Sequence, residues 1–251
     1  MEFWGQAEKT CYRTVILFHN TLALSLTRRF FIYLYYEIKY LYKEKTDFIP
    51  APLEIPKSVK DTCKLHILQR LTVVFSDTSI FPKVNQSENF NKYDIFAVLP
   101  TTLQAFQFTC VNSDADIITF EHDTKLPFKI PRKLYRLAAE RGICFELMYS
   151  PAIKDSTSRK NIISTAHSFH AVGKSRNIIV TSGSDNHAQV RGVHDVINLG
   201  FILGLSGNQC VEVIRDNARK LILKAQSRKC GKHFMLVSQS EECTENKMDD
   251  S

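Results

Sequence analysis

Short apolar runs alternate with longer amphipathic segments through the central part of the chain. The runs are rich in Val, Ile, Leu and Phe, and they fall at residues 71–75, 94–99, 116–120, 143–148 and 177–181. Each run predicts a strand, and most are followed by a polar loop and then by apolar positions at helical spacing. Strands that are apolar on both faces and separated by helices are typical of a parallel sheet enclosed by helices. The pattern therefore predicts an α/β fold.

The most informative segment, residues 145–160, joins one of these strands to a helix. Pro151 stiffens the loop, and Asp155 or Ser156 is placed to cap the helix that follows. We predict one helix over residues 154–172. Its apolar side chains fall on one face, at Ile162, Ile163, Ala166, Phe169 and Val172.

A second long helix is predicted near the C-terminal end. Ser206 and Gln209 have the spacing of a capping box, after which apolar residues recur at the spacing of one buried face as far as residue 225. We expect the solvent-exposed face of this helix to carry Arg215, Arg219 and Arg228.

Both ends of the chain are less regular. Two apolar stretches, residues 15–26 and 30–42, are interrupted or flanked by polar residues, and neither has the about 18 uninterrupted apolar residues of a membrane span. Three prolines make residues 47–57 linker-like, and the mostly acidic stretch 241–250 is typical of a solvated end. The predicted division is an atypical N-terminal segment (1–39), an α/β barrel domain (40–229) and a disordered tail (230–251).

The amino-acid composition indicates a single basic domain that binds a polyanion. The 251 residues are 44% hydrophobic and 24% charged, which suits one α/β barrel. A net charge of +7 and a pI near 9.0 favour nucleic acid or another polyanion. Seven cysteines without a Cys-x-x-Cys pair predict reduced thiols in a nuclear or cytoplasmic protein.

Candidate anion-binding residues gather where two predicted strands end. Lys154, Arg159 and Lys160 lie at a helix start, whose free N–H groups already favour anions. Arg191 follows the loop that begins at Ser182, after the next strand. Arginine suits bidentate phosphate contact, and no pattern of a base-stacking platform is present. Phosphate contact with folded RNA therefore fits better than sequence readout.

Metal-assisted hydrolysis is the enzymatic alternative. The chain has no Gly-x-Ser-x-Gly, phosphate-loop or dinucleotide motif, and no His-x-His pair. The two helix histidines, His167 and His170, are more simply explained as helix-surface or boundary residues, and a structural role is also favoured for Asp185 and His187. The candidates are Glu146, Asp155, His167, His170, Asp185, His187 and His194.

The segment 145–160 resembles, nearly residue for residue, a segment of the thirty-kilodalton protein subunit family of ribonuclease P and RNase MRP (the eukaryotic and archaeal RNase P protein component 3). The resemblance extends over residues about 40–229, and the N-terminus departs from it. Further landmarks in the same order are residues 70–77, 93–100, 125–128, 191–200 and 204–206.

This resemblance implies a TIM-barrel-like fold of the PHP type and an accessory role in the 5′-end maturation of precursor tRNA. Catalysis is then expected from metal ions on the RNA subunit, with no cofactor, metal or catalytic side chain on this chain. The implied partners are ribonuclease P/MRP RNA, other protein subunits, notably a small Pop5-like one, and indirectly precursor tRNA, in the nucleus or nucleolus and with no membrane. The residues expected to bind RNA or a protein partner are Lys154, Ser156, Arg159, Lys160, Ser182 and Arg191.

The missing first strand predicts an incomplete barrel. A closed barrel needs its first strand to pair with its last, so a substitute or two open edges are expected. We expect residues 1–39 to form a helix or a poorly docked segment, with Phe30, Phe31 and Tyr35 partly covering the gap. The alternative functions are a stand-alone metal-dependent PHP-type phosphoesterase and a structural interaction protein without RNA contact.

Overall fold

The computed structural model describes residues 13–18, 30–38, 49–52, 65–184 and 186–231. Strands and helices alternate over most of this part, as the apolar pattern predicted. The strands are β1 (Arg13–Phe18), β2 (Phe30–Ile38), β3 (Leu65–Phe75), β4 (Ile95–Pro100), β5 (Ile117–Ile118), β6 (Cys144–Met148) and β7 (Ile178–Thr181). The helices are α2 (Ile80–Gln86), α3 (Leu103–Asn112), α4 (Arg132–Glu140), α5 (Ser150–Lys154), α6 (Ser156–Gly173), α7 (Val193–Ile202), α8 (Gly207–Ile214) and α9 (Asp216–Cys230). Two 3-10 turns, η1 (Phe90–Lys92) and η2 (His187–Gln189), complete the described elements.

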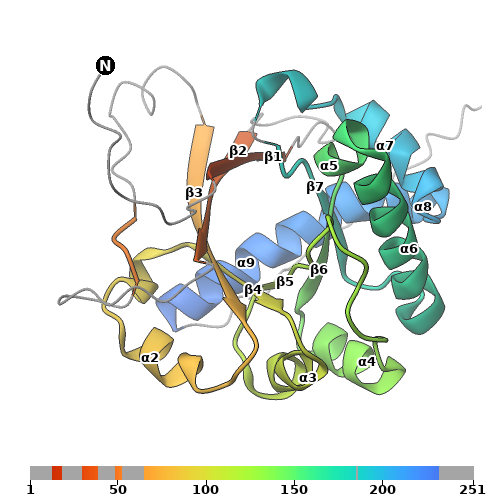
Figure 1. Ribbon diagram of the computed structural model, residues 1–251. Helices are drawn as coiled ribbons and strands as arrows, with labels where there is room; N and C mark the ends of the chain where they lie inside the picture. Colours follow the sequence, from red (N-terminus) through yellow and green to blue (C-terminus); the bar gives the residue numbers. More distant parts are fainter. Residues whose placement is uncertain (1–12, 19–29, 39–48, 53–64, 185, 232–251) are drawn as a thin grey trace, which may run out of the picture.

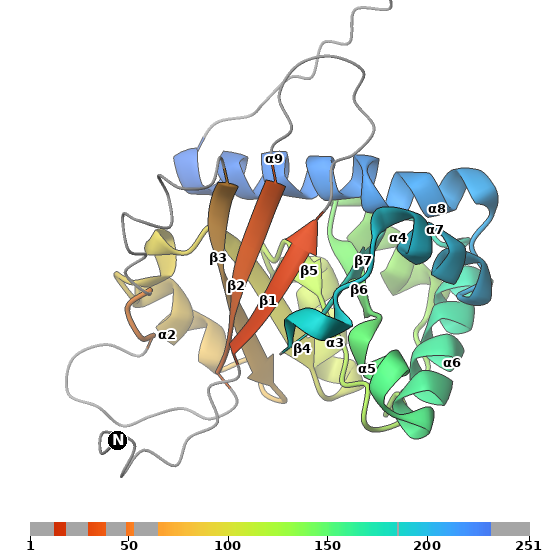
Figure 2. The same ribbon diagram turned by 90° about the horizontal axis from the view of Figure 1, so that it is seen from above.

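The strands form a single sheet in the order of the chain. Neighbouring strands from β2 to β7 run parallel, and β1 pairs antiparallel with β2. Figures 1 and 2 show the sheet curving around a common centre, with helices along its outside and α9 across one end. Within the described residues no strand ladder joins β1 to β7, although the two strands lie close together. The predicted α/β class, with a barrel-like parallel sheet that does not close, is confirmed.

The N-terminal part differs from the sequence prediction. A helix or a poorly docked segment was expected within residues 1–39, but residues 13–18 and 30–38 are strands. The β2 sequence is rich in aromatic and β-branched residues, which favour extended backbone, and it pairs with β3 along its whole length. The expected helix is therefore wrong, and the sheet begins before residue 40. The expected contacts of Phe30, Phe31 and Tyr35 concern side chains outside the described part.

The two faces of the sheet pack against different helices. Phe96 and Phe145 belong to the large core between the sheet and the surrounding helices. The residues that precede them, Ile95 and Cys144, point to the other face and pack with Leu221 of α9. This alternation follows from the two-residue period of a strand. Helix α9 therefore fills the amino-terminal end of the barrel-like sheet.

Of the two long predicted helices, the first forms almost as expected and the second is divided in two. The first is α6, which Asp155 caps by accepting a hydrogen bond from the Ser158 N–H (2.8 Å), so the predicted cap is confirmed. The short helix α5 occupies residues that were expected to form a loop. The second begins as predicted with Ser206 N–H donating to Gln209 Oε1 (3.0 Å), and it divides at Arg215 into α8 and α9.

Helix α9 ends at Cys230, the first residue of the predicted C-terminal tail. The predicted tail, apart from its first two residues, lies outside the described part of the chain. Of the described helices, none combines the length and the apolar character needed to cross a membrane.

Candidate functional site

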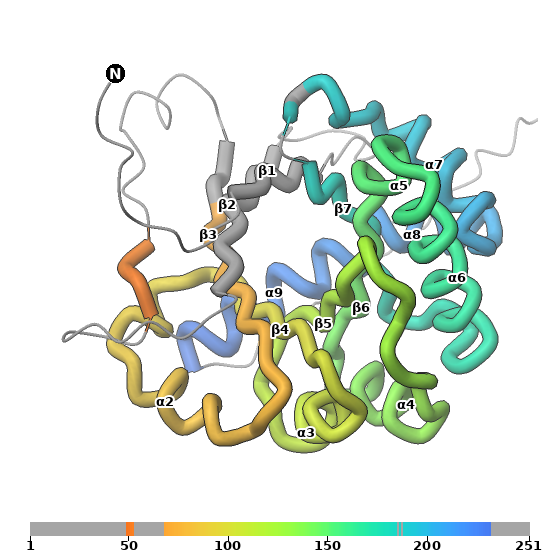
Figure 3. Tube along the Cα trace, in the orientation of Figure 1, coloured from red at the N-terminus to blue at the C-terminus, as the bar shows by residue number. Residues whose placement is uncertain are grey.

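The predicted site lies at the carboxyl ends of β6 and β7, where the strands lead into α5 and into the loop before α7. Hydrogen bonds continue the strand pairing outward, from Tyr149 N–H to the Thr181 carbonyl (3.0 Å) and from Ser150 N–H to the Ser182 carbonyl (2.9 Å). The Arg191 N–H then donates to the Tyr149 hydroxyl at 3.0 Å. These contacts bring the Arg191 loop directly to the start of α5. Figure 3 traces this path from β6 into α5 and α6.

We call the exposed cations at this edge, Lys154, Arg159, Lys160 and Arg191, the rim cations. All four are exposed, as is Ser156. Arg159 also has an internal role, because its Nε donates to the Ala152 carbonyl (2.7 Å) at the C-terminal end of α5. Ser182, which was also expected to bind RNA or a protein partner, is completely buried in this structure.

A third loop at the same edge was not predicted. The loop after β5 is tied to the first turns of α6, where Asn161 Nδ2 donates to the His122 carbonyl (3.1 Å) and Ser158 Oγ donates to Asp123 Oδ1 (3.3 Å). In the sequence, this contact was indicated only by the polar residues that follow β5, among them His122 and Asp123. The rim therefore includes loops from three neighbouring strands.

The interior of the sheet, just below this rim, holds a buried ion pair. Arg70 of β3 makes a bidentate pair with Glu146 of β6, with both N–O distances 2.7 Å and both side chains almost completely buried. The Thr181 hydroxyl donates to Glu146 Oε1 at 2.9 Å. Burial alone would raise the pKa of Glu146, but Arg70 and the hydroxyl donors outweigh burial and leave the pKa below its ordinary value.

The candidate metal ligands do not come together in the described residues. Among these residues, no group of three or more His, Cys, Asp or Glu side chains is placed to hold a metal ion. Glu146 is paired with Arg70, Asp155 caps α6, and the Nδ1 of His170 lies 3.2 Å from Ser175 Oγ. Asp185 and the side chain of His187 lie outside the described part.

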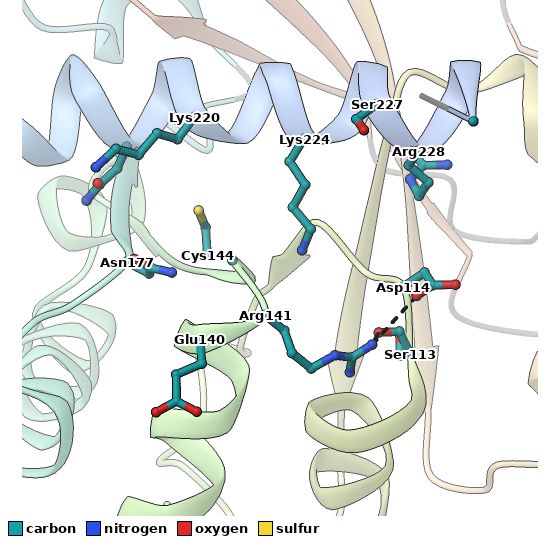
Figure 4. A pocket seen from close by; sticks show the side chains of 13 residues that line it. Ser113, Asp114, Glu140, Arg141, Cys144, Asn177, Lys220, Lys224, Ser227 and Arg228 are labelled. Atoms are coloured by element: carbon teal, nitrogen blue, oxygen red, sulfur yellow. Dashed lines mark hydrogen bonds and ion pairs between the residues drawn. The ribbon is translucent and has the colours of Figure 1, made fainter. Parts of the chain in front are cut away.

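A pocket of about 820 Å³ lies at the opposite end, between α9 and the turns that follow α3 and α4. Its cations hold the fold together, as Figure 4 shows for Arg141, which reaches toward Ser113 and Asp114. Arg141 also donates to the Cys110 carbonyl (2.9 Å), and Lys224 of α9 donates to the Ala115 carbonyl (3.1 Å).

The strongest of these contacts joins α9 to the start of β5. Arg228 was expected on the solvent side of its helix, but it donates to the buried carboxylate of Asp116 at 3.0 Å. That expectation is wrong, because Arg228 lies three residues after the buried Ala225 and so shares its face. Burial is the main cause of a raised pKa for Asp116, and Arg228 opposes it.

Comparison with known proteins identifies the family. The family described as RNase P subunit p30 matches residues 7–230. The chain belongs to this family. The match begins well before residue 40, so the p30 family extends further toward the N-terminus than the resemblance predicted. Its members are protein subunits of ribonuclease P, and this chain is one of them.

Individual relatives agree with the p30 assignment. The chain is 32% identical to the mouse "Ribonuclease P protein subunit p30" over 217 residues, covering 83% of this chain and 80% of the mouse protein. It is 30% identical to "Probable ribonuclease P protein subunit 3" of Schizosaccharomyces pombe, covering 70% of this chain and 74% of that one. It is 26% identical to the Saccharomyces cerevisiae "Ribonuclease P/MRP protein subunit RPP1", covering 70% and 61%.

A solved structure has the same fold. One chain of the "cryo-EM structure of archaeal Ribonuclease P with mature tRNA" is similar with a TM-score of 0.57 and 14% sequence identity. The likeness covers 74% of this chain and 82% of that chain. The barrel-like α/β architecture is therefore shared with a solved protein. Because the sequence identity is low, this comparison shows a common fold and nothing more.

Proposed function

We propose that this chain is a non-catalytic subunit of ribonuclease P, shared with RNase MRP, that supports 5′-end maturation of precursor tRNA. In this proposal metal ions on the RNA subunit carry out phosphodiester cleavage. The protein braces the RNA and its neighbouring proteins. The observation that supports it most is the buried pair between Arg70 and Glu146.

The pair lies inside the sheet, with Glu146 in the middle of β6 and almost no exposed surface on either side chain. Both oxygens of Glu146 already accept hydrogen bonds from Arg70, and one also accepts from Thr181. If this carboxylate bound a metal ion or took up a proton, the Arg70 charge would stay buried without its partner. Breaking a buried pair in this way costs roughly 3–5 kcal/mol, by analogy with other buried pairs. Glu146 is therefore better suited to holding β3 and β6 together than to chemistry.

The rim cations supply the RNA contact in this proposal. Lys160 lies in the first turns of α6, where the helix dipole favours anions, and the Arg191 loop is fixed against Tyr149. Contacts of this kind orient a phosphate backbone without reading its sequence. Because three loops are tied together at the rim, the cations are held on a common surface before RNA binds.

The partners follow from the same proposal. They are the RNA of ribonuclease P and of RNase MRP, the other protein subunits, among them a small Pop5-like one, and precursor tRNA indirectly. We place the chain in the nucleus and its nucleolus, since relatives in mouse and Saccharomyces cerevisiae are named as subunits of ribonuclease P or of ribonuclease P/MRP.

Copurification tests this function. The full chain is tagged in cells and purified, and the RNA of ribonuclease P is quantified against an untagged control. We expect strong enrichment for the wild type, and a reduction of several-fold for a Lys160→Gln/Arg191→Gln variant. The matched control is Lys83→Gln, which removes an exposed cation of α2, across the molecule from α5 and α6 (Figure 1), and it should match the wild type. If the wild type brings down no ribonuclease P RNA above background, the proposed function is wrong.

A further inference from the structure

A second group of cations lines a small groove between α4 and the C-terminal end of α6. We call it the α4–α6 groove. Its volume is about 260 Å³, and every charged residue that lines it is a cation: Arg132, Arg136, Lys174 and Arg176. No carboxylate lines it, in contrast to the pocket beneath α9, where Asp114 and Glu140 accompany the cations.

The floor of this groove is rigid. Tyr135 is almost completely buried, its hydroxyl donates to the Arg176 carbonyl (2.6 Å), and its ring stacks on Phe145 with centroids 4.1 Å apart. A Cβ at Gly173 would lie only 1.9 Å from Tyr135 Cε1, so this position has no room for a side chain. The groove is therefore formed before any ligand arrives.

The cations of the groove are available for an external anion. Within the described residues, the side chains of Lys174 and Arg176 make no hydrogen bond or ion pair. Arg136 pairs with Glu140 at 3.3 Å, but both side chains are mostly exposed, and exposed pairs of this kind are worth little. Arg132 donates one bond to the Ala171 carbonyl and retains further N–H groups. By contrast, Arg141, Lys224 and Arg228 beneath α9 are all bonded internally.

We infer that the α4–α6 groove binds phosphates of RNA, as a second contact separate from the rim cations. This inference rests on the proposed function and deepens it. The planar guanidinium group of arginine can donate two parallel hydrogen bonds to the oxygens of a phosphate. The apolar floor of the groove is better suited to a ribose or a base than to another charged group.

The geometry of α6 separates the two contacts. This helix has 18 residues, with Lys160 near its first turn and Lys174 directly after its end. At a rise of 1.5 Å per residue, its ends are about 27 Å apart. A single phosphate group therefore cannot reach both sites, and the chain is expected to hold two separated segments of folded RNA.

The test uses in-vitro transcribed ribonuclease P RNA and the purified full chain, with binding measured by fluorescence anisotropy as a function of KCl. The groove variant is Arg136→Gln/Arg176→Gln. Its control is Lys133→Gln, which removes an exposed cation from α4 that does not line the groove. A conservative variant, Arg136→Lys/Arg176→Lys, keeps both charges.

If two phosphate contacts are lost, the fall in affinity between about 50 and 200 mM salt should be roughly tenfold smaller for the groove variant than for the wild type. The control and the conservative variant should stay close to the wild type, and circular dichroism should be unchanged in all of them. An unchanged salt slope for the groove variant, with normal binding by the wild type, would overturn the inference and leave the proposed function standing. If the groove variant, tagged in cells, loses a protein partner on copurification while its RNA binding by anisotropy stays normal, the inference is also overturned, in favour of an acidic protein ligand. No RNA binding by the wild type would overturn both.

Discussion

Replacing Arg70 by Met should destabilise the fold strongly, because it removes the partner of a buried carboxylate. The two guanidinium–carboxylate contacts of 2.7 Å are lost, and Glu146 has no solvent to replace them. Breaking a buried pair in this way costs about 3–5 kcal/mol. At about 2–4 °C per kcal/mol for a chain of this size, the melting temperature should fall by roughly 6–20 °C.

The pH dependence of this loss has a definite sign. In the wild type the pKa of Glu146 is below its ordinary value of 4.5, so its contribution to stability is lost only as the pH falls through the lowered pKa. In Arg70→Met, burial acts without its cation and raises the pKa of Glu146 above that value. The variant should then gain stability as the pH falls from 8 toward 5, while the wild type gains none from this group.

Urea denaturation of the wild type, Arg70→Met and Arg70→Met/Glu146→Leu, each at pH 8 and pH 5, measures both effects. The double variant should recover most of the lost stability, because replacing both partners by apolar groups leaves no buried charge. If the single variant loses less than about 1 kcal/mol, or if the double variant is as unstable as the single one, the ion pair is not as isolated from water as the structure indicates.

Three further predictions concern other parts of the molecule. Gly173→Ala should cost about 1–3 kcal/mol in thermal denaturation, because the new Cβ overlaps the Tyr135 ring; an unchanged melting temperature would contradict this packing. Arg228→Leu should raise the pKa of Asp116 further and speed hydrogen exchange in the C-terminal turns of α9, and unchanged exchange would show that the ion pair does not hold this helix. Elemental analysis of the purified chain should find no stoichiometric zinc, manganese or iron, whereas a bound metal lost in His187→Ala would favour the phosphoesterase alternative.

Local signals in the sequence predicted local structure well. The strands β3 to β7 lie where the apolar runs predicted them, and the caps at Asp155 and Ser206 form as expected, because both depend on residues only a few positions apart. Helix α5 was not predicted, because Pro151 indicated a loop there, whereas the cap that starts α6 was. Asp155 is both the residue after the last turn of α5 and the N-cap of α6, so it separates the two helices.

Contacts between distant parts of the chain could not be predicted in the same way. Arg70 and Glu146 are 76 residues apart, and only the curvature of the sheet turns both side chains inward to meet. Arg176 and Tyr135 are 41 residues apart, so the α4–α6 groove has no signature in the sequence of either helix. The rim cations were predicted because they follow strand ends, and the burial of Ser182 was missed because strand pairing continues one residue past β7.

The most direct test of the accessory role is a single-turnover cleavage assay with a reconstituted ribonuclease P particle. Particles are assembled with the wild-type chain or with Arg70→Met/Glu146→Leu, which removes the buried carboxylate from the sheet interior without leaving a charge behind. If catalysis belongs to the RNA, both particles should cleave precursor tRNA with the same rate constant. A large fall in that rate constant for a variant that folds and assembles normally would show that this chain takes part in the chemistry.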